Sequence, residues 1–213
     1  MSNEYGYIPE APEQSFGNNK GIFTPKDIYD LTRADKYTNY GQLELIETQT
    51  VSEVSAVNFE NMQENNYNVH LITYSFDSTP NGQVDDTIIT RVRTGGSYVS
   101  SGYQYAEQFG NTTGTFSEIK STSASWLSRA GDSTGQENEH RSTGYIYCYN
   151  FGDSSKYSFV TTHHSGTTAT SGFVMHFGSS VYPVANVVDG FKFFGYWSLL
   201  ITGTASLYGI RYS

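Results

Sequence analysis

Short runs of alternating side chains recur along most of the chain from Gln42 onward. In "YNVHLITYSF" (67–76) and "TGYIYCYNF" (143–151), every second residue falls on the same face, which is the period of a β-strand. Similar runs, bounded by turn sequences such as "PNG" and "GDSS", occupy 43–48, 54–59, 87–93, 101–109, 156–164, 172–178, 188–197 and 203–213. Eight to ten short strands predict an all-β body over 42–213, an antiparallel, jelly-roll-like β-sandwich.

The first 41 residues follow a different pattern. Residues 1–21 show no periodicity and predict an extended arm, but they carry apolar anchors suited to ordering on a partner, namely Tyr5, Tyr7, Ile8 and Phe16. In "FTPKDIYDLTRADKY", Thr24 precedes Pro25 and Asp27 falls in the first turn, so a short helix is expected over 25–36. Ile28 and Leu31 would seat this helix on the sandwich. We therefore divide the chain into an attachment segment, 1–41, and a sandwich, 42–213.

One polar stretch, 110–142, lacks a clear period. Phe116, Ile119, Trp126 and Leu127 are isolated among Ser, Thr, Gly and Asn, so this region is expected to form mostly long loops. Loops on a rigid sandwich are frequent binding sites. Aromatic residues in or beside this region, Tyr103 and Trp126 above all, are candidates for stacking on sugar rings, although core or subunit-interface positions are the stronger interpretation of such residues.

Composition supports the β assignment and narrows the partners. The 213 residues include 18 Tyr and 13 Phe, and only 15% are charged, a mixture that suits pleated sheets better than long helices. The net charge of −9, without a cluster of Lys or Arg, argues against nucleic acid or an anionic membrane as a partner. The N-terminus shows no secretion signal, and the apolar region 181–210 is interrupted by charges and glycines.

Catalytic and metal-binding patterns are weak. His163 and His164 are adjacent and would point to opposite faces of a strand, and a pairing of His163 with His176 is the remaining metal alternative. The paired carboxylates (Asp85 with Asp86, Glu137 with Glu139) and the calcium candidates (Asp77, Asp85, Asp86, Asp132) fit solvated turns. Cys148 lies inside a strand without a partner base. We therefore expect no enzymatic activity, no catalytic residue, no metal and no cofactor.

Several segments, taken together, match a known pattern. "ELIETQTVS" (44–52), "VNF" (57–59), "YNVHLITY" (67–74), "YIYCYNFGDSSKYSF" (145–159) and "GTASLYGI" (203–210) resemble virion structural proteins of tailed phages of marine bacteria, especially cyanophages. The "NNKGIFTPKDIYDLTRADKY" leader (18–37) is similar to the stretch that precedes this domain in the group. The resemblance implies a sandwich displayed on the particle, at the capsid surface or in the tail and its fibres, and it implies no catalytic residues.

The expected function is a non-enzymatic, peripheral virion component that decorates the capsid or belongs to the tail and fibres. Its expected partners are other virion proteins and further copies of itself, with a homotrimer favoured because closed symmetry is usual in such appendages. The attachment contacts are expected at Tyr5, Tyr7, Ile8 and Phe16. The alternative is a module that recognises a glycan on the host surface from the virion, with contacts at Tyr103 and Trp126.

Overall fold

The computed structural model describes residues 14–15, 18–19, 24–33, 43–79, 87–131, 141–168, 172–197 and 199–210. The chain divides into two compact units. The first comprises residues 1–42 with residue 213, and the second comprises residues 43–212. The two units are described separately below.

The N-terminal unit contains one helix and one small ladder. Strands β1 (Gln14–Ser15) and β2 (Asn18–Asn19) pair antiparallel, and α1 spans Pro25–Arg33. The predicted helix is confirmed, and its start follows from the cap: the Asp27 N–H donates to Thr24 Oγ1 (3.2 Å), while the Thr24 N–H donates to Asp27 Oδ2 (2.8 Å). The last part of the predicted range 25–36 lies outside the described residues.

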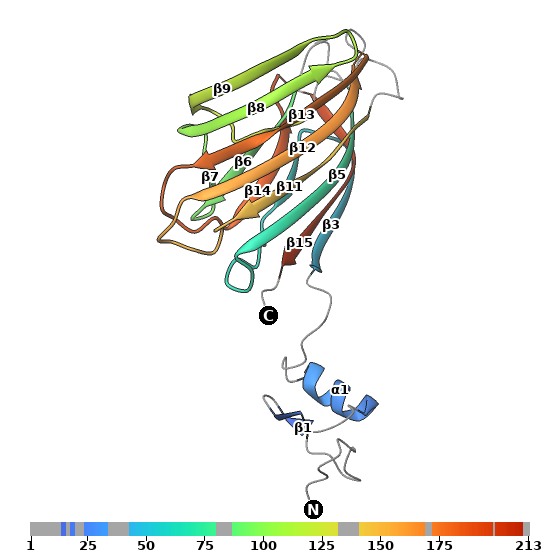
Figure 1. The fold of residues 1–213 in the computed structure, drawn as a ribbon, viewed down its shortest axis with the longest axis vertical. Helices are drawn as coiled ribbons and strands as arrows, with labels where there is room; N and C mark the ends of the chain where they lie inside the picture. The colour runs from blue at the N-terminus through green and yellow to red at the C-terminus, as the bar shows by residue number, and fades with distance from the viewer. Residues whose placement is uncertain are drawn as a thin grey trace, which may run out of the picture. The chain divides into compact units, whose positions relative to one another are not determined.

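The larger sheet of the body has eight antiparallel strands (Figure 1). Their order is β3-β15-β5-β11-β12-β13-β8-β9, so the first and last long strands of the body lie side by side. The bounds are β3 (Leu43–Val54), β5 (Val69–Thr79), β8 (Tyr103–Asn111), β9 (Phe116–Ala124), β11 (Arg141–Tyr149), β12 (Ser158–Thr168), β13 (Gly172–Tyr182) and β15 (Leu200–Ile210).

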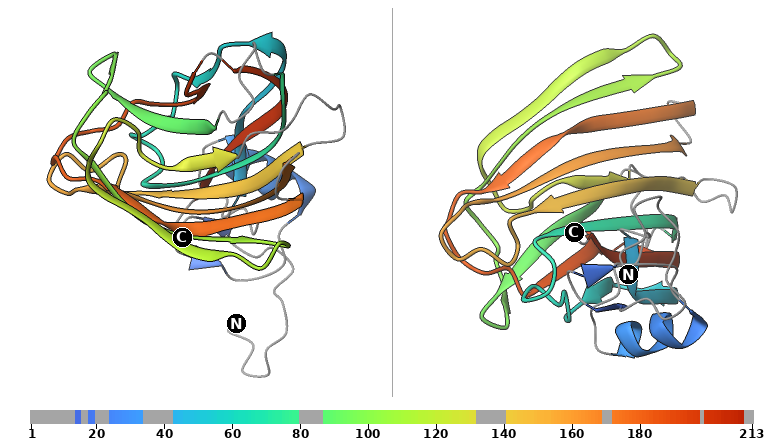
Figure 2. Two further views of the ribbon diagram at one scale, coloured as in Figure 1. Left: turned by 90° about the horizontal axis from the view of Figure 1, so that it is seen from above. Right: turned by 60° about the horizontal axis from the view of Figure 1, so that its bottom comes forward.

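The smaller sheet has five strands and forms the second layer, as the two views of Figure 2 show. Its order is β10-β6-β14-β4, with β7 paired to β6. The bounds are β4 (Ala56–Phe59), β6 (Ile88–Thr94), β7 (Ser97–Tyr98), β10 (Arg129–Gly131) and β14 (Gly190–Gly195). All pairings in both sheets are antiparallel, so the prediction of an all-β, antiparallel sandwich is confirmed; the jelly-roll connectivity stays a prediction.

The core lies between the two sheets. Phe193 of β14 packs its ring against Tyr74 and Phe76 of β5, at centroid distances of 5.0 and 5.2 Å. Phe191 and Phe59 of the smaller sheet are also fully buried. Burying each such side chain contributes roughly 1.5–3 kcal/mol relative to exposure. The packing of this aromatic layer therefore stabilises the contact between the two sheets.

The expectation of long loops over 110–142 is wrong in part. Strand β9 pairs with β8 through a short turn in which Asn111 Oδ1 accepts the N–H of Thr115 (2.9 Å) and the hydroxyl of Thr113 (2.8 Å). Strand β10 pairs with β6. Most side chains of β9 are exposed on both faces because it is an edge strand, so no alternation of apolar residues marks it in the sequence. Residues 132–140 lie outside the described residues.

Candidate functional site

The outer face of the five-stranded sheet carries several charged side chains. Its cross-strand register places Arg91 of β6 opposite Lys192 of β14, and Lys192 opposite Asn58 of β4. Arg93 lies one row away, opposite Gly190. The inward positions of the same strands are apolar, including Val92, Phe191 and Phe193. This sheet therefore has the usual polarity, with an apolar inside and a polar outside.

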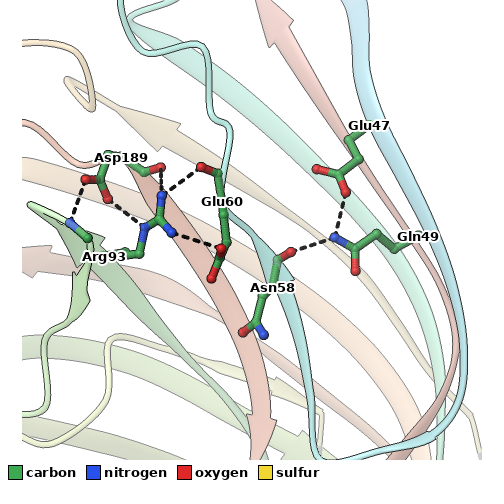
Figure 3. A network of polar contacts seen from close by, with 7 residues as sticks. Glu47, Gln49, Asn58, Glu60, Arg93 and Asp189 are labelled. Carbon is green, nitrogen blue, oxygen red and sulfur yellow. Dashed lines mark hydrogen bonds and ion pairs between the residues drawn. The ribbon is translucent and has the colours of Figure 1, made fainter.

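Arg93 is the centre of an ion-pair network that joins three segments (Figure 3). Its Nε lies 2.9 Å from Asp189 Oδ1, its Nη1 lies 3.1 Å from Glu60 Oε2, and its Nη2 donates to the Glu60 carbonyl oxygen (2.7 Å). Asp189 Oδ2 also accepts the N–H of Gly96 (2.9 Å). Since the Arg93 side chain is only 15% exposed, this charge depends on its carboxylate partners.

A glycine permits this arrangement. A Cβ on Gly190 would lie 2.8 Å from Arg93 Nε and 2.9 Å from the Phe59 carbonyl oxygen. The guanidinium group thus passes over β14 at Gly190, where no side chain stands in the way. Arg93 is consequently held as a structural cation, and its charge is balanced within the protein.

Arg91 and Lys192 form a second, different cationic arrangement. Lys192 Nζ lies 4.4 Å from the ring centroid of Tyr98 and 4.7 Å from that of Phe194, and Arg91 Cζ lies 4.6 Å from the Phe194 centroid. Burial, together with the neighbouring charge of Arg91, lowers the pKa of Lys192. Arg91 Nε donates to the carbonyl oxygen of Ser125 (2.8 Å). Within the described part of the chain, neither cation forms an ion pair.

A polar depression adjoins this cation pair. It has a volume of about 530 Å³ and is lined by Glu47, Gln49, Ala56, Asn58, Glu60 and Asn61. Gln49 links two sides of this lining, because its Nε2 donates to Glu47 Oε1 (2.8 Å) and to the Asn58 carbonyl oxygen (2.6 Å) (Figure 3). Asn58 is both a wall of the depression and the cross-strand neighbour of Lys192, so the two features form one continuous surface.

The outer face of the eight-stranded sheet instead carries exposed apolar side chains, which lie among Ser and Thr residues such as Thr73 and Thr161. Seven of the large hydrophobic side chains that are exposed in the described residues point outward from it, namely Leu43, Leu45, Phe116, Tyr145, Phe159, Phe173 and Phe177. Tyr147, Tyr149 and Val181 lie in the same rows and are half-buried. On the outward side of β5, β11 and β12, the charged residues are Asp77 and Arg141, which pair with each other at 3.0 Å, so that region of the face carries no net charge.

The inner face of β11–β13 is unusually polar. Its buried residues include Ser142, Thr162, His164, His176 and Ser180. Strand β10, an edge strand of the other sheet, lies over this region, and its backbone is met by side chains of the larger sheet. The Arg129 N–H donates to Glu107 Oε1 (3.3 Å), and Thr162 Oγ1 donates to the Arg129 carbonyl oxygen (3.4 Å). Glu107 and Thr162 therefore serve backbone groups of Arg129 that would otherwise be buried without partners.

The adjacent residues His163 and His164 lie on opposite faces of strand β12, as their sequence positions predict. His163 is exposed on the outer face, and His164 is buried on the inner face. The cross-strand partner of His176 is His164, not His163, and the two rings stack at 4.6 Å. Among the described residues, no group of three or more His, Cys, Asp or Glu is placed to hold a metal. Asp85, Asp86, Asp132, Glu137 and Glu139 lie outside the described residues.

Cys148 and His70 are buried on the inner face of the eight-stranded sheet. Burial raises the pKa of the Cys148 thiol and lowers the pKa of His70 to about 4. His70 Nε2 lies 2.7 Å from the Met62 carbonyl oxygen, a contact that requires the proton on Nε2. Both groups are neutral near pH 7 and belong to the core.

The residues predicted from sequence fall into three groups. Tyr103 is fully buried, its hydroxyl donates to the Val99 carbonyl oxygen (2.9 Å), and so it is removed from the glycan-contact prediction. Trp126 is half-buried and stacks on Tyr105 at 4.2 Å. Ile28 and Leu31 are half-buried within the N-terminal unit, and their role in seating the helix stays a prediction. The predicted anchors lie outside the described residues: Tyr5, Tyr7, Ile8 and Phe16.

Sequence reasoning missed the Arg91–Lys192 pair. Both residues were visible as polar positions inside strand-like runs, "TIITRVR" and "GFKFFG", but their register across separate strands was not. Comparisons of the chain with protein-family models, with curated proteins and with solved structures found no match. Within the described residues, no helix has the length and apolar character needed to cross a bilayer.

Proposed function

We propose that this protein is a non-enzymatic structural component of a phage virion, displayed on the outside of the particle at the capsid surface or on the tail and its fibres. The N-terminal segment attaches it, and the sandwich is the displayed part. The link to phage particles rests on the sequence resemblance of residues 42–213 described above. The separation of a small N-terminal unit from a large β body is compatible with that division of labour.

The observation that carries the proposal is the apolar outer face of the eight-stranded sheet. Exposed aromatic and aliphatic side chains stand there on β3, β9, β11, β12 and β13, for example Leu43, Leu45, Phe173 and Phe177. Such a surface is costly to leave in water and is typical of protein–protein contacts. Its occupant in our proposal is a further copy of the chain, because two molecules with a net charge of −9 repel each other least through a face of low charge. We propose a homotrimer as the assembled form.

The attachment role is tested with the N-terminal segment itself. We expect that deletion of residues 1–21 leaves a folded body, judged by an unchanged thermal unfolding midpoint, which no longer appears in purified particles. A full-length variant in which Tyr5, Tyr7, Ile8 and Phe16 are replaced by Ser keeps the chain length and should also be lost from particles. Incorporation of the truncated chain at the wild-type level would contradict the proposal.

A second candidate function is recognition of a host-surface saccharide from the virion. It is favoured by the outer face of the five-stranded sheet, where a polar depression adjoins two cations that lack carboxylate partners in the described part of the chain. Carboxylate and amide side chains such as those of Glu47, Gln49 and Asn58 are well suited to sugar hydroxyl groups. This candidate function no longer includes Tyr103 as a glycan contact, because Tyr103 is buried in the core.

A further inference from the structure

Arg91 and Lys192 occupy positions that ordinary stability does not explain. They are directly opposite each other on neighbouring antiparallel strands, where two like charges destabilise the sheet. The protein has 21 acidic and only 12 basic residues, so an acidic partner for either cation would be easy to provide. The neighbouring Arg93 has two such partners, Asp189 and Glu60. The absence of one beside Arg91 and Lys192, among the described residues, therefore distinguishes this pair.

The hydrogen-bonding capacity of the pair is also largely unused. Arg91 donates from Nε to the Ser125 carbonyl oxygen, and no described residue accepts from its two terminal nitrogens. Lys192 is half-buried and makes no hydrogen bond to a described residue; it lies between the rings of Tyr98 and Phe194. The rings attract the ammonium group through its charge, but they accept none of its three N–H donors in full. An external oxyanion would satisfy both side chains.

The surroundings indicate what else such a ligand contains. Asn58, beside Lys192, leads into the depression of about 530 Å³ that Glu47, Gln49, Glu60 and Asn61 also line. These groups offer several acceptors and amide donors, which match sugar hydroxyls. A polynucleotide fits less well, because a phosphate next to the bound group would meet Glu47 and Glu60 in the depression, whereas a sugar hydroxyl there can donate to these carboxylates.

We propose that Arg91 and Lys192 bind the acidic group of an anionic saccharide, a sulfate ester or a carboxylate, while the depression beside Asn58 receives neighbouring hydroxyl groups. This inference rests on the second candidate function, saccharide recognition, and not on the structural role in the virion. The acidic substituent is the main determinant of affinity, since charged hydrogen bonds are stronger than neutral ones.

The inference is tested by titrating the full-length protein with three polymers: dextran sulfate, polygalacturonate and uncharged dextran. We expect binding of at least one of the two acidic polymers at 150 mM salt and no measurable binding of dextran. Whether dextran sulfate or polygalacturonate binds more tightly distinguishes sulfate from carboxylate. The double variant Arg91→Gln/Lys192→Gln should weaken binding by about a hundredfold, roughly tenfold for each charged donor removed.

A matched control removes two cations elsewhere. Lys120→Gln/Lys156→Gln changes the net charge equally, but Lys120 is on the edge strand β9 and Lys156 is in the turn before β12, so binding should change less than twofold. Lys192→Met keeps the apolar stem and removes the repulsion; it should leave the denaturation midpoint unchanged or raised while it weakens binding about tenfold.

Four results would overturn the inference. Failure of all three polymers to bind would remove saccharide recognition altogether, whereas equal binding of dextran would keep it and reject the acidic determinant. Equal losses in the two double variants would show a general charge effect. If single-stranded DNA binds as tightly as the best polymer and is lost in Arg91→Gln/Lys192→Gln, the site belongs to a polynucleotide. Particle incorporation is measured separately, so none of these results bears on the structural role.

Discussion

The two sheets of the sandwich distribute polarity differently. The five-stranded sheet turns Phe191 and Phe193 inward and Arg91, Arg93 and Lys192 outward. In the eight-stranded sheet, strands β11–β13 bury polar side chains such as His164 and Ser180 beside apolar ones on the inner face, and turn large rings such as Tyr145 and Phe177 outward. The first pattern is that of a sheet facing water, and the second is the one expected under our proposal that the outer face contacts a further copy of the chain.

Part of the polarity on the inner face of the eight-stranded sheet has a local cause. Strand β10 is short and lies at an edge, so its backbone groups need partners that the apolar core cannot offer, and Glu107 and Thr162 supply them. No comparable internal requirement accounts for the rings on the outside. Tyr145, Phe159 and Phe177 each remain between 42% and 47% exposed, and this exposure is what an association with a further copy would remove.

The largest expected effect concerns His70, a buried group on the inner face of the eight-stranded sheet. Burial lowers its folded-state pKa to about 4, below the ordinary value of 6.5. The unfolded chain therefore binds the proton first as pH falls, so the stabilisation present above pH 6.5 is lost between about 6.5 and 4, by about 3 kcal/mol. Urea unfolding at several pH values should show this loss in the wild type and not in His70→Gln.

His163, on the outer face of the same sheet, gives the matched control. Because its side chain is exposed, His163→Gln should leave the free energy of unfolding at pH 7 close to the wild-type value. A large loss at pH 7 in His163→Gln, or a pH dependence unchanged from the wild type in His70→Gln, would show that the inner and outer positions of this sheet do not differ as described.

A smaller effect on the free energy of unfolding is expected for the outer face of the five-stranded sheet. Arg93→Ala leaves Asp189 without its cation and the Glu60 carbonyl oxygen without its donor, so the free energy of unfolding should fall by about 2 kcal/mol. Lys192 forms no ion pair with a described residue, so Lys192→Met should change the free energy of unfolding by less than about 0.5 kcal/mol. Denaturant titration measures both, and similar losses in the two variants would contradict the distinction between a structural and an available cation.

The sequence predicted the fold well where local chemistry decides it. Thr24, Pro25 and Asp27 fix the helix start, and alternation located ten of the thirteen strands of the body. Strands β7, β9 and β10 were missed because an edge strand exposed on both faces, and strands of two or three residues, have no apolar period. Periodicity does not specify which residues lie opposite each other on neighbouring strands. The pairing of Arg91 with Lys192 depends on contacts between segments that are distant in the sequence.

Side-chain roles were harder to predict than strands. Tyr103 sits in an aromatic stretch beside a polar region, which suggested a surface contact, yet a register shift in the β8–β9 pairing accompanies its position in the core. Trp126 was placed near the surface, but its ring is stacked on Tyr105. The face to which an aromatic residue points depends on sheet pairing, and therefore on tertiary structure.

The most direct test of the account is the mass of the full-length protein in solution, measured by sedimentation equilibrium. We predict about three times the 23.7 kDa chain mass for the wild type and a monomer for Tyr145→Asp/Phe177→Asp, which places charges in the centre of the apolar face. A control with equally exposed apolar residues in loops, Tyr157→Asp/Val184→Asp, should sediment as the wild type. A monomeric wild type at tens of micromolar, or a face variant that still associates, would contradict the assignment of this face.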